Sequence, residues 1–280
     1  MEANLLQQIR KIKEIKQLNF VCDEKEFIDP YRINPNSSLL AARAKEKIIK
    51  YFDAFFEAVK NEDLQMVYLL GKHLHEINAT KLGYSAPGVE PRGKGFSQYD
   101  LVAIYNAAQR IKDHIVSMPD ILVFAEKVGP DKISDLTTNI IYEELLQFTK
   151  EIIDKYNLPI EYVTTKKWII DVNDSIWIQK ELMVPVVDGK EILFLPEEIV
   201  TANQIFSYLN VYNDLVWPFY KSNPAVHNLI RTLKKGVSSD SKKLKKRYPP
   251  TRATVEEFRL KYPDKYDLYK ENMQKSYWRH

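Results

Sequence analysis

The apolar residues of this chain change their spacing near Pro119, and the change limits the folds that the chain can adopt. Before Pro119 they recur every three or four residues, most clearly over residues 38–60, which predicts long amphipathic helices. After Pro119, the runs ILVFAE, IEYVTT, KKWIIDV and SIWIQ have β character, and Asp188-Gly189 predicts a hairpin over residues 181–200. The sequence therefore predicts an α+β fold with a helical N-terminal half, a small mixed or antiparallel sheet, and a basic helical C-terminal tail.

Local signals place further elements. Ser97, followed by Asp100 three residues later, predicts a capping box at the start of a helix. A basic loop is expected at residues 234–250, followed by two short helices that meet at Tyr262-Pro263. Trp168 and Trp177 are expected to fill the core rather than to stack on bases. Helices are predicted for residues 62–77, 97–116, 134–156 and 201–220.

The charge distribution divides the chain. Residues 221–280 contain 16 Lys and Arg against 6 Asp and Glu, whereas the other 220 residues contain 25 against 32. We therefore predict a core domain at residues 1–220 (helical to 118, mixed from 119) and a basic appendage at residues 221–280. The appendage could attract a polyanion or be an ordinary solvated surface. Its candidate nucleic-acid contacts are Lys242, Lys243, Lys245, Lys246 and Arg247.

The composition limits where the protein can be located in the cell and which kinds of metal site it can contain. No apolar run approaches the roughly 20 residues that a membrane span needs. The N-terminal segment is charged and lacks the apolar stretch of a secretory signal. The single cysteine, Cys22, excludes an internal disulfide and a cysteine-based zinc site. These features predict a cytoplasmic protein that does not cross a membrane.

The stretch VFAEKVGPDKISDLTTNIIYEELLQFTKEI is unusually rich in short polar side chains. We expect a strand to end at Gly129-Pro130 and a helix to begin with Ser134 or Asp135 as its N-cap. Asp131 can close the turn through its own backbone. These roles leave the following Thr-Thr-Asn run, residues 137–139, unexplained, since none of the three is a preferred helix former.

Asp131 and Asp135 suggest a functional use for this stretch. Two carboxylates four residues apart, opposed by hydroxyls and an amide, suit a divalent cation, or a phosphate held through that cation. Mg²⁺ and Mn²⁺ are the expected cofactors. The sequence therefore predicts a metal site here.

A second candidate region is KHLHEINATKLGYSAPGVEPRGKG. His73, His75 and Glu76 lie at the end of a predicted helix, where His73 and Glu76 share one face. This group is either a weak metal signal or a surface histidine pair. In the glycine-rich loop at residues 83–95, Arg92 and Lys94 could contact phosphates, although a connecting loop is an equal alternative. If the site is composite, this loop lies near Asp131 and Asp135.

Four runs carry a resemblance to a known family: FIDPYRI, HEINATKLGYS, GPDKISDLTTNII and DGKEILFLPEEIV. They resemble a widespread bacterial family of uncharacterised proteins with the motif G-P-D-[RK]-I-S-D-[LM]-T-T-N-I-I and a closing strand L-L-V-P-K. The resemblance covers most of the chain and implies a link to phage-defence or restriction loci, but no activity. Glu197 stands here where the family has the lysine after the strand proline, so a catalytic role of that lysine would be altered.

The candidate residues favour a metal-dependent nuclease or nuclease-like effector. Glu76, Asp131 and Asp135 would hold the metal, with Lys190 and Glu191 on the hairpin, as in PD-(D/E)XK-type nucleases. The match is incomplete, because no E-x-K or D-x-K lies within a predicted strand beside Gly-Pro-Asp. The alternative is a non-catalytic binding or regulatory subunit of a defence or toxin complex. Nucleic acid and a protein from the same operon are the expected partners, and the oligomeric state is open.

Overall fold

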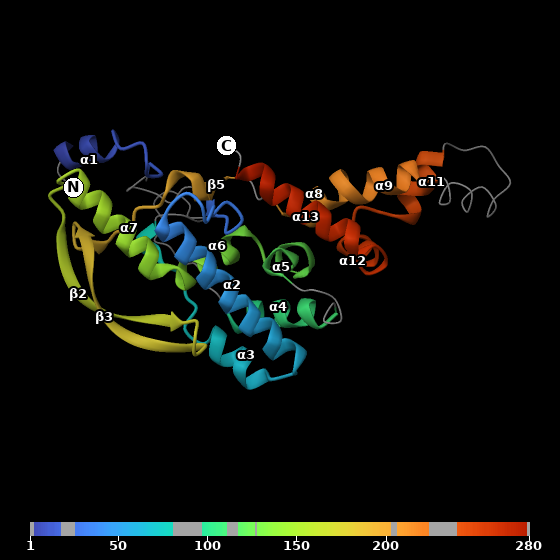
Figure 1. The fold of residues 1–280 in the computed structure, drawn as a ribbon, viewed down its shortest axis with the longest axis horizontal. Coiled ribbons are helices and arrows are strands. Elements are labelled where there is room, and N and C mark those ends of the chain that lie inside the picture. The colour runs from blue at the N-terminus through green and yellow to red at the C-terminus, as the bar shows by residue number, and fades with distance from the viewer. Residues whose placement is uncertain are drawn as a thin grey trace.

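The computed structural model describes residues 3–17, 26–80, 97–110, 117–126, 128–202, 206–223 and 240–278 (Figure 1). Helices form the N-terminal half and the C-terminal end, and the strands form two small antiparallel sheets. The predicted α+β class is therefore confirmed. No helix within these residues combines the length and the apolar character that a bilayer span requires.

Capping residues set the starts of the helices in the first half. The Ser38 hydroxyl accepts a hydrogen bond from the Ala41 amide at 3.0 Å. Asp100 accepts from both the amide and the hydroxyl of Ser97, at 2.7 and 2.6 Å, which confirms the predicted capping box. The helices of this half are α1 (Ala3–Ile9), α2 (Leu39–Lys60), α3 (Leu64–Gly71) and α4 (Gln98–Arg110), followed by the short 3₁₀ turn η1 (Asn78–Thr80).

The run ILVFAE is helical, so the predicted strand is wrong. It belongs to α5 (Met118–Phe124), which begins at Ser117 with Asp120 three residues later and Pro119 in the first turn. Every residue of α5 is buried. A run that is buried all round has no polar face, so its spacing does not separate a helix from a strand.

The predicted helix at residues 134–156 is two helices, α6 (Pro130–Ile140) and α7 (Tyr142–Lys155). Gly129 is the N-cap of α6, so the predicted capping role of Ser134 or Asp135 is wrong. Proline at the first position is compatible with a helix start, because its missing N–H would have no partner there. The chain turns at Ile141, where φ is −103° and ψ is 23°.

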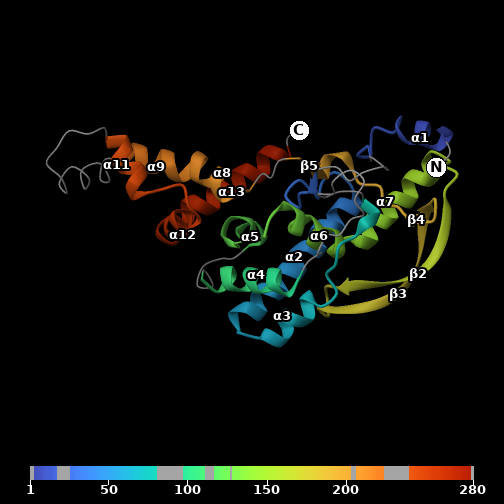
Figure 2. The same cartoon turned by 180° about the vertical axis from the view of Figure 1, so that it is seen from behind.

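A long two-stranded ribbon forms most of the sheet structure. Strand β2 (Glu161–Asp171) pairs antiparallel with β3 (Ile176–Val187), from Glu161↔Val186 to Asp171↔Ile176. The runs predicted as separate pieces are therefore one ribbon, which curves past α7 (Figures 1 and 2). The Asp188-Gly189 turn, with φ of 51° and 71°, leads into β4 (Lys190–Glu191) and confirms the predicted turn. The predicted second apolar strand is wrong, because β4 has only two residues and the apolar run after it, residues 192–195, is not a strand.

A second, smaller sheet pairs β1 (Phe27–Ile28) with β5 (Val200–Thr201), which follows the 3₁₀ turn η2 (Glu197–Ile199). The next helix has three parts, and its middle is a π-helical turn. Pro218 has no N–H and its ring crowds the carbonyl four residues earlier, which explains the wider turn before it. The three parts are α8 (Tyr208–Val211), η3 (Tyr212–Val216) and α9 (Trp217–Ser222).

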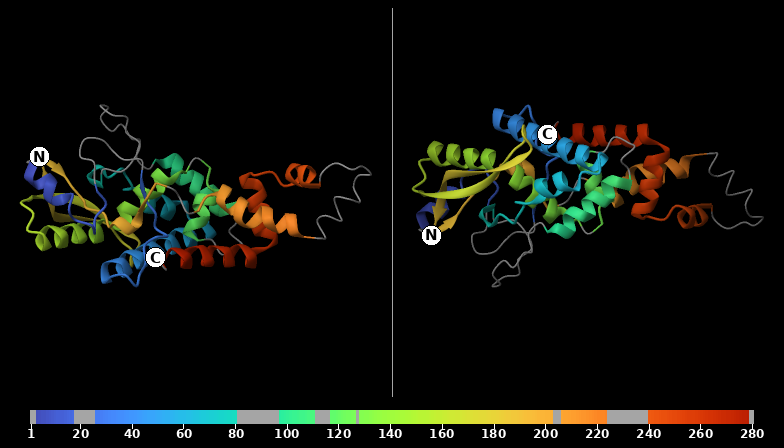
Figure 3. Two further views of the ribbon diagram at one scale, coloured as in Figure 1. Left: turned by 90° about the horizontal axis from the view of Figure 1, so that it is seen from above. Right: turned by 90° about the horizontal axis from the view of Figure 1, so that it is seen from below.

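The C-terminal segment contains α11 (Asp240–Arg247), α12 (Arg252–Lys261) and α13 (Pro263–Tyr277). The basic run in α11 was expected to be a loop, and that prediction is wrong. Leu244 is fully buried, so one apolar contact orients the surrounding lysines outward. The predicted break at Tyr262-Pro263 is confirmed. Helix α11 lies at the end of the molecule opposite the β2–β3 ribbon (Figure 3).

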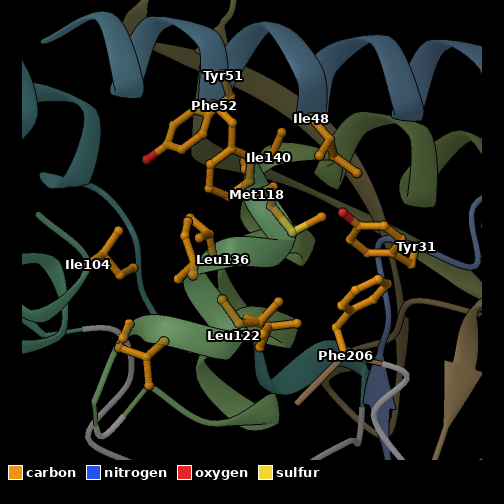
Figure 4. Close-up of a cluster of buried hydrophobic side chains, with 14 of the residues drawn as sticks. Tyr31, Ile48, Tyr51, Phe52, Ile104, Met118, Leu122, Leu136, Ile140 and Phe206 are labelled. Atoms are coloured by element: carbon orange, nitrogen blue, oxygen red, sulfur yellow. The ribbon is translucent and has the colours of Figure 1, made fainter. Parts of the chain in front are cut away.

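The main hydrophobic core joins the two halves of the chain. It brings Tyr31, Tyr51, Leu136 and Phe206 into one buried cluster (Figure 4), which continues into the C-terminal helices through Phe258. A smaller cluster packs α1 against α7 and the chain after β4. The predicted domain boundary at residue 220 stays a prediction.

A buried ionic network fastens the C-terminal helices to α5. Asp120 and Arg259 are each 1% exposed, and an Arg259 Nη lies 3.3 Å from the Asp120 carboxylate. The Tyr266 hydroxyl donates to the same carboxylate at 2.9 Å, and the Lys270 ammonium lies 3.3 Å away. The Ser117 amide also donates to it, at 2.9 Å. One carboxylate is therefore shared by α5, α12 and α13.

Candidate functional site

A pocket of about 470 Å³ lies between the segment after α3, the α6–α7 junction and the sheet. Its volume falls within the range of small-molecule sites in proteins. Three of the residues predicted from sequence line it: Glu76, Lys190 and Glu191. The structure thus places the acid from the first half of the chain beside the tip of the hairpin.

Hydrogen bonds hold the walls of the pocket together. The Asn139 amide donates to the His75 carbonyl at 2.6 Å and to the Asp135 carbonyl, one turn back in α6, at 2.7 Å. On the other side, the Leu193 amide donates to the Ala79 carbonyl at 2.9 Å. The segment that carries Glu76 is therefore fixed to both α6 and the chain after the hairpin.

Tyr142 forms a buried part of the wall. Its side chain is 4% exposed, and among the described residues its hydroxyl has no hydrogen-bond partner. Burial, and then the charge of Glu191, raise the pKa of Tyr142 above its ordinary value, so the phenol keeps its proton. The Lys167 ammonium lies 2.6 Å from the Glu191 carboxylate and 5.8 Å from the centre of the Tyr142 ring.

Trp168 adds an aromatic surface to the pocket. Its indole is 39% exposed, so the expectation that it fills the core is wrong. His73 stacks on it, with ring centres 3.9 Å apart and planes 13° from parallel. Trp177 does pack against the core, as expected, and its indole N–H donates to the Leu70 carbonyl at 2.9 Å.

Asp131 and Asp135, the predicted metal ligands on α6, are not among the residues that line the pocket, but the charge of Glu76, which does line it, reaches Asp135. Asp131 and Asp135 are one helical turn apart and share a face. Burial, followed by the charges of Asp131 and Glu76, raises the pKa of Asp135 from an ordinary 3.8 to about 8. Asp100 adds to this effect and Lys132 opposes it. Burial also raises the pKa of Asp131. Asp135 is therefore close enough to both other predicted metal ligands, Asp131 and Glu76, to feel their charges.

The hydroxyls that follow on α6 have local structural roles. The Thr137 and Thr138 hydroxyls donate to the carbonyls of Ile133 and Ser134, at 2.6 and 2.8 Å. Such bonds satisfy a buried hydroxyl within its own helix. The Ser134 hydroxyl accepts from the Ile28 amide at 3.0 Å and so fixes β1 to α6. Of the Thr-Thr-Asn run, Asn139 alone lines the pocket.

The remaining predicted residues lie elsewhere. Arg92 and Lys94, with the whole loop at residues 83–95, fall outside the described residues. The five basic residues of the tail are on α11, at the end of the molecule away from the ribbon (Figures 1 and 3). Within the described part of the chain, no three His, Cys, Asp or Glu side chains are positioned to hold a metal ion directly.

Asp135 makes stability depend on pH in a defined direction. Folded Asp135 keeps its proton up to about pH 8, whereas the unfolded residue loses it near 3.8. The folded state binds more protons in this window, so the free energy of unfolding falls as pH rises through it. The free energy of unfolding should fall by about 4 kcal/mol between about pH 5 and about pH 8, and Asp135→Asn should remove most of this fall in urea unfolding.

Asp53→Asn, on the exposed side of α2, is the matched control and should leave the pH dependence unchanged. If the free energy of unfolding changes with pH equally in Asp135→Asn and in the wild type, Asp135 is ionised in the folded state at neutral pH.

Sequence comparison places residues 8–207 in a known family. Its model is described as a domain of unknown function (DUF8370), and the match includes every pocket residue but ends before α8. No curated protein and no solved structure matches the chain significantly. Since the match covers most of its length, the chain belongs to the family of the domain of unknown function DUF8370.

Proposed function

We propose that this protein is a metal-dependent nuclease or nuclease-like effector that acts on nucleic acid with Mg²⁺ or Mn²⁺ as cofactor. One observation carries the proposal: Glu76 lines the pocket together with Lys190 and Glu191, and its charge also raises the pKa of Asp135. Carboxylates can hold the cation for metal-assisted phosphate ester hydrolysis, and a nearby lysine can neutralise the phosphate.

Each residue has a defined role in this proposal. Glu76, Asp131 and Asp135 would hold the cation, in part through its water ligands, since Mg²⁺ usually keeps several waters. When bound, the cation would supply Lewis-acid activation of water and phosphate. Lys190 would neutralise a phosphate oxygen. Glu191 would accept the proton of the attacking water as the new P–O bond forms, and the departing ester oxygen would take a proton from solvent.

Thermal unfolding with Mg²⁺, Mn²⁺ or EDTA tests the proposal directly. A cation that binds the folded state stabilises it by mass action, and we expect Mn²⁺ to raise the Tm by about 3 °C or more. Asp131→Asn should abolish this increase and leave the Tm in EDTA unchanged, while Asp53→Asn should retain it. No increase for the wild type, or loss of the fold of Asp131→Asn in EDTA, would contradict the metal site.

The basic helix α11 is proposed to contact phosphates. The side chains of Lys242, Lys245, Lys246 and Arg247 are exposed, and the Lys245 ammonium lies 5.3 Å from the centre of the Trp217 ring. Such contacts release counterions and carry little sequence preference. Replacing the five basic residues with Gln should reduce the slope of log K against log salt by about 4 to 5 for duplex DNA, if each residue neutralises one phosphate.

Binding is measured by fluorescence anisotropy across a salt series. A matched control removes five cations, all of them exposed, from the N-terminal part of the chain, at Arg10, Lys11, Lys13, Lys60 and Lys72. An unchanged slope for the α11 variant, or an equal reduction in the control, would identify α11 as an ordinary solvated surface.

A second candidate function is a non-catalytic binding or regulatory subunit of a defence or toxin complex. The observation in its favour is the pKa of Asp135, because a carboxyl that keeps its proton at neutral pH is a hydrogen-bond donor and a poor metal ligand. In either case we propose a cytoplasmic protein, a role in phage defence, and a protein partner from the same operon. Binding of nucleic acid without cation-dependent hydrolysis would favour this second function.

A further inference from the structure

We propose that the pocket binds a single unpaired nucleotide, with its base on Trp168 and its phosphate between the Lys190 ammonium and the Tyr142 hydroxyl. This inference rests on the proposed function, since it names the form of nucleic acid that reaches the same pocket. It implies that single strands, overhangs or flipped nucleotides are the substrate, and that an intact duplex is not.

The Tyr142 hydroxyl is the first observation that points to a ligand. It belongs to a side chain that is 4% exposed, and no described residue satisfies it. Nearly all buried polar groups in proteins have a hydrogen-bond partner, so an unsatisfied hydroxyl on a residue that lines the pocket favours a ligand that supplies a partner. Burial and Glu191 keep the phenol protonated, which makes it a donor to an anion.

Charge balance limits the ligand to one phosphate. Lys190 and Lys167 line the pocket, and so do Glu76 and Glu191. The Lys167 ammonium is already held by Glu191 at 2.6 Å, which leaves Lys190, at the tip of the hairpin, to meet a ligand anion. Two acidic residues in the same wall repel a polyanion such as a triphosphate, whereas a phosphodiester carries one charge.

The open face of Trp168 accounts for the base. His73 stacks against one face of the indole, Trp168 as a whole is 39% exposed, and it is one of the residues that line the pocket. Bases of single strands stack on such aromatic surfaces without sequence preference. In a duplex, both faces of each base are covered by its neighbours. Only an unpaired nucleotide therefore presents a free face together with its phosphate.

The pocket volume agrees with this ligand. About 470 Å³ is ample for a mononucleotide by the usual range of ligand sites. A duplex cannot enter the pocket. The grooves of B-DNA alone are roughly 6–12 Å wide, so the whole double helix is much larger than this cavity.

Calorimetric titration with the methyl ester of adenosine 5′-monophosphate, a phosphodiester with one charge, tests the pocket. EDTA prevents catalysis, and a ligand with a single charge does not engage the basic tail as a polyanion would. We expect saturable binding. Trp168→Leu, which keeps an apolar side chain but removes the stacking surface, should weaken it by about tenfold or more. Tyr142→Phe, which removes only the hydroxyl, should weaken it by about tenfold. Trp168→Phe should retain most of the affinity. Tyr68→Phe, on the exposed side of α3, is the control and should bind as the wild type does.

A parallel assay compares hydrolysis of a single strand with that of the same sequence as a duplex in Mg²⁺. The inference is overturned if the nucleotide does not bind, or if Trp168→Leu and Tyr142→Phe bind it as tightly as the wild type. Equal cleavage of both substrates without nucleotide binding would leave the proposed nuclease standing and reject the inference. Nucleotide binding with the expected losses, but no hydrolysis, would support the pocket and reject the nuclease.

Discussion

Asp120→Ala is expected to destabilise the protein by about 3–5 kcal/mol, the usual cost of breaking a buried ion pair. The change leaves the guanidinium of Arg259, which is 1% exposed, without its carboxylate. It also removes the acceptor of the Tyr266 hydroxyl and the capping box of α5. Urea unfolding followed by circular dichroism measures the effect, and α12 and α13 should lose protection from hydrogen exchange together.

A comparison with a more exposed ion pair shows whether burial causes the large destabilisation expected for Asp120→Ala. Arg110, at 44% side-chain exposure, pairs with Glu256 at 3.2 Å, and Glu256→Ala should cost less than about 1 kcal/mol. The double variant Asp120→Leu, Arg259→Met should recover part of the stability lost in Asp120→Ala, because it leaves fewer unpaired buried charges. A cost near that of Glu256→Ala would show that water reaches Arg259.

Glu76→Gln is expected to reduce cation-dependent hydrolysis of nucleic acid by about 100-fold or more, since it removes a ligand charge from the proposed metal site. Without that charge the pKa of Asp135 should also fall, because Glu76 contributes to raising it. Initial rates at saturating Mg²⁺ give the first effect, and the pH dependence of unfolding gives the second.

Glu271→Gln is the matched control, because it makes the same change on the exposed surface of α13, with a side chain that is 62% exposed. It should retain full activity. If Glu76→Gln hydrolyses nucleic acid as fast as Glu271→Gln, Glu76 does not hold the cation and the metal site must be sought elsewhere.

Short-range signals made several elements predictable. Helix caps and tight turns depend only on residues close in sequence. The helix starts at Ser38 and Ser97 and the turn at Asp188-Gly189 therefore lie where they were expected. The ILVFAE run was mistaken for a strand because its burial on all sides removes any periodicity. The Ser117-Met-Pro-Asp120 sequence before it is a capping box with proline in the first turn, and this signal identifies the helix.

The pocket was only partly predictable. Asp131 and Asp135 share a face through simple helical geometry, so their proximity follows from spacing alone. Lys167 and Trp168 reach the pocket through the pairing of β2 with β3 and the curve of the ribbon, which depend on contacts far apart in sequence. Tyr142 lies just after the turn at Ile141, and one unbroken helix through this point would have turned it differently.

Helix α11 lies at the end of the molecule opposite the β2–β3 ribbon (Figure 3), and this ribbon contributes Lys167 and Trp168 to the pocket, so the two proposed contact regions lie on different parts of the molecule. Under the proposed function, a strand held by the α11 lysines reaches the pocket only after crossing the part of the molecule between them. Oligonucleotides below a threshold length would occupy one end at a time, and longer ones would gain affinity abruptly through the second contact. Cleavage would then fall at a fixed distance from the anchored segment, whatever the sequence in between.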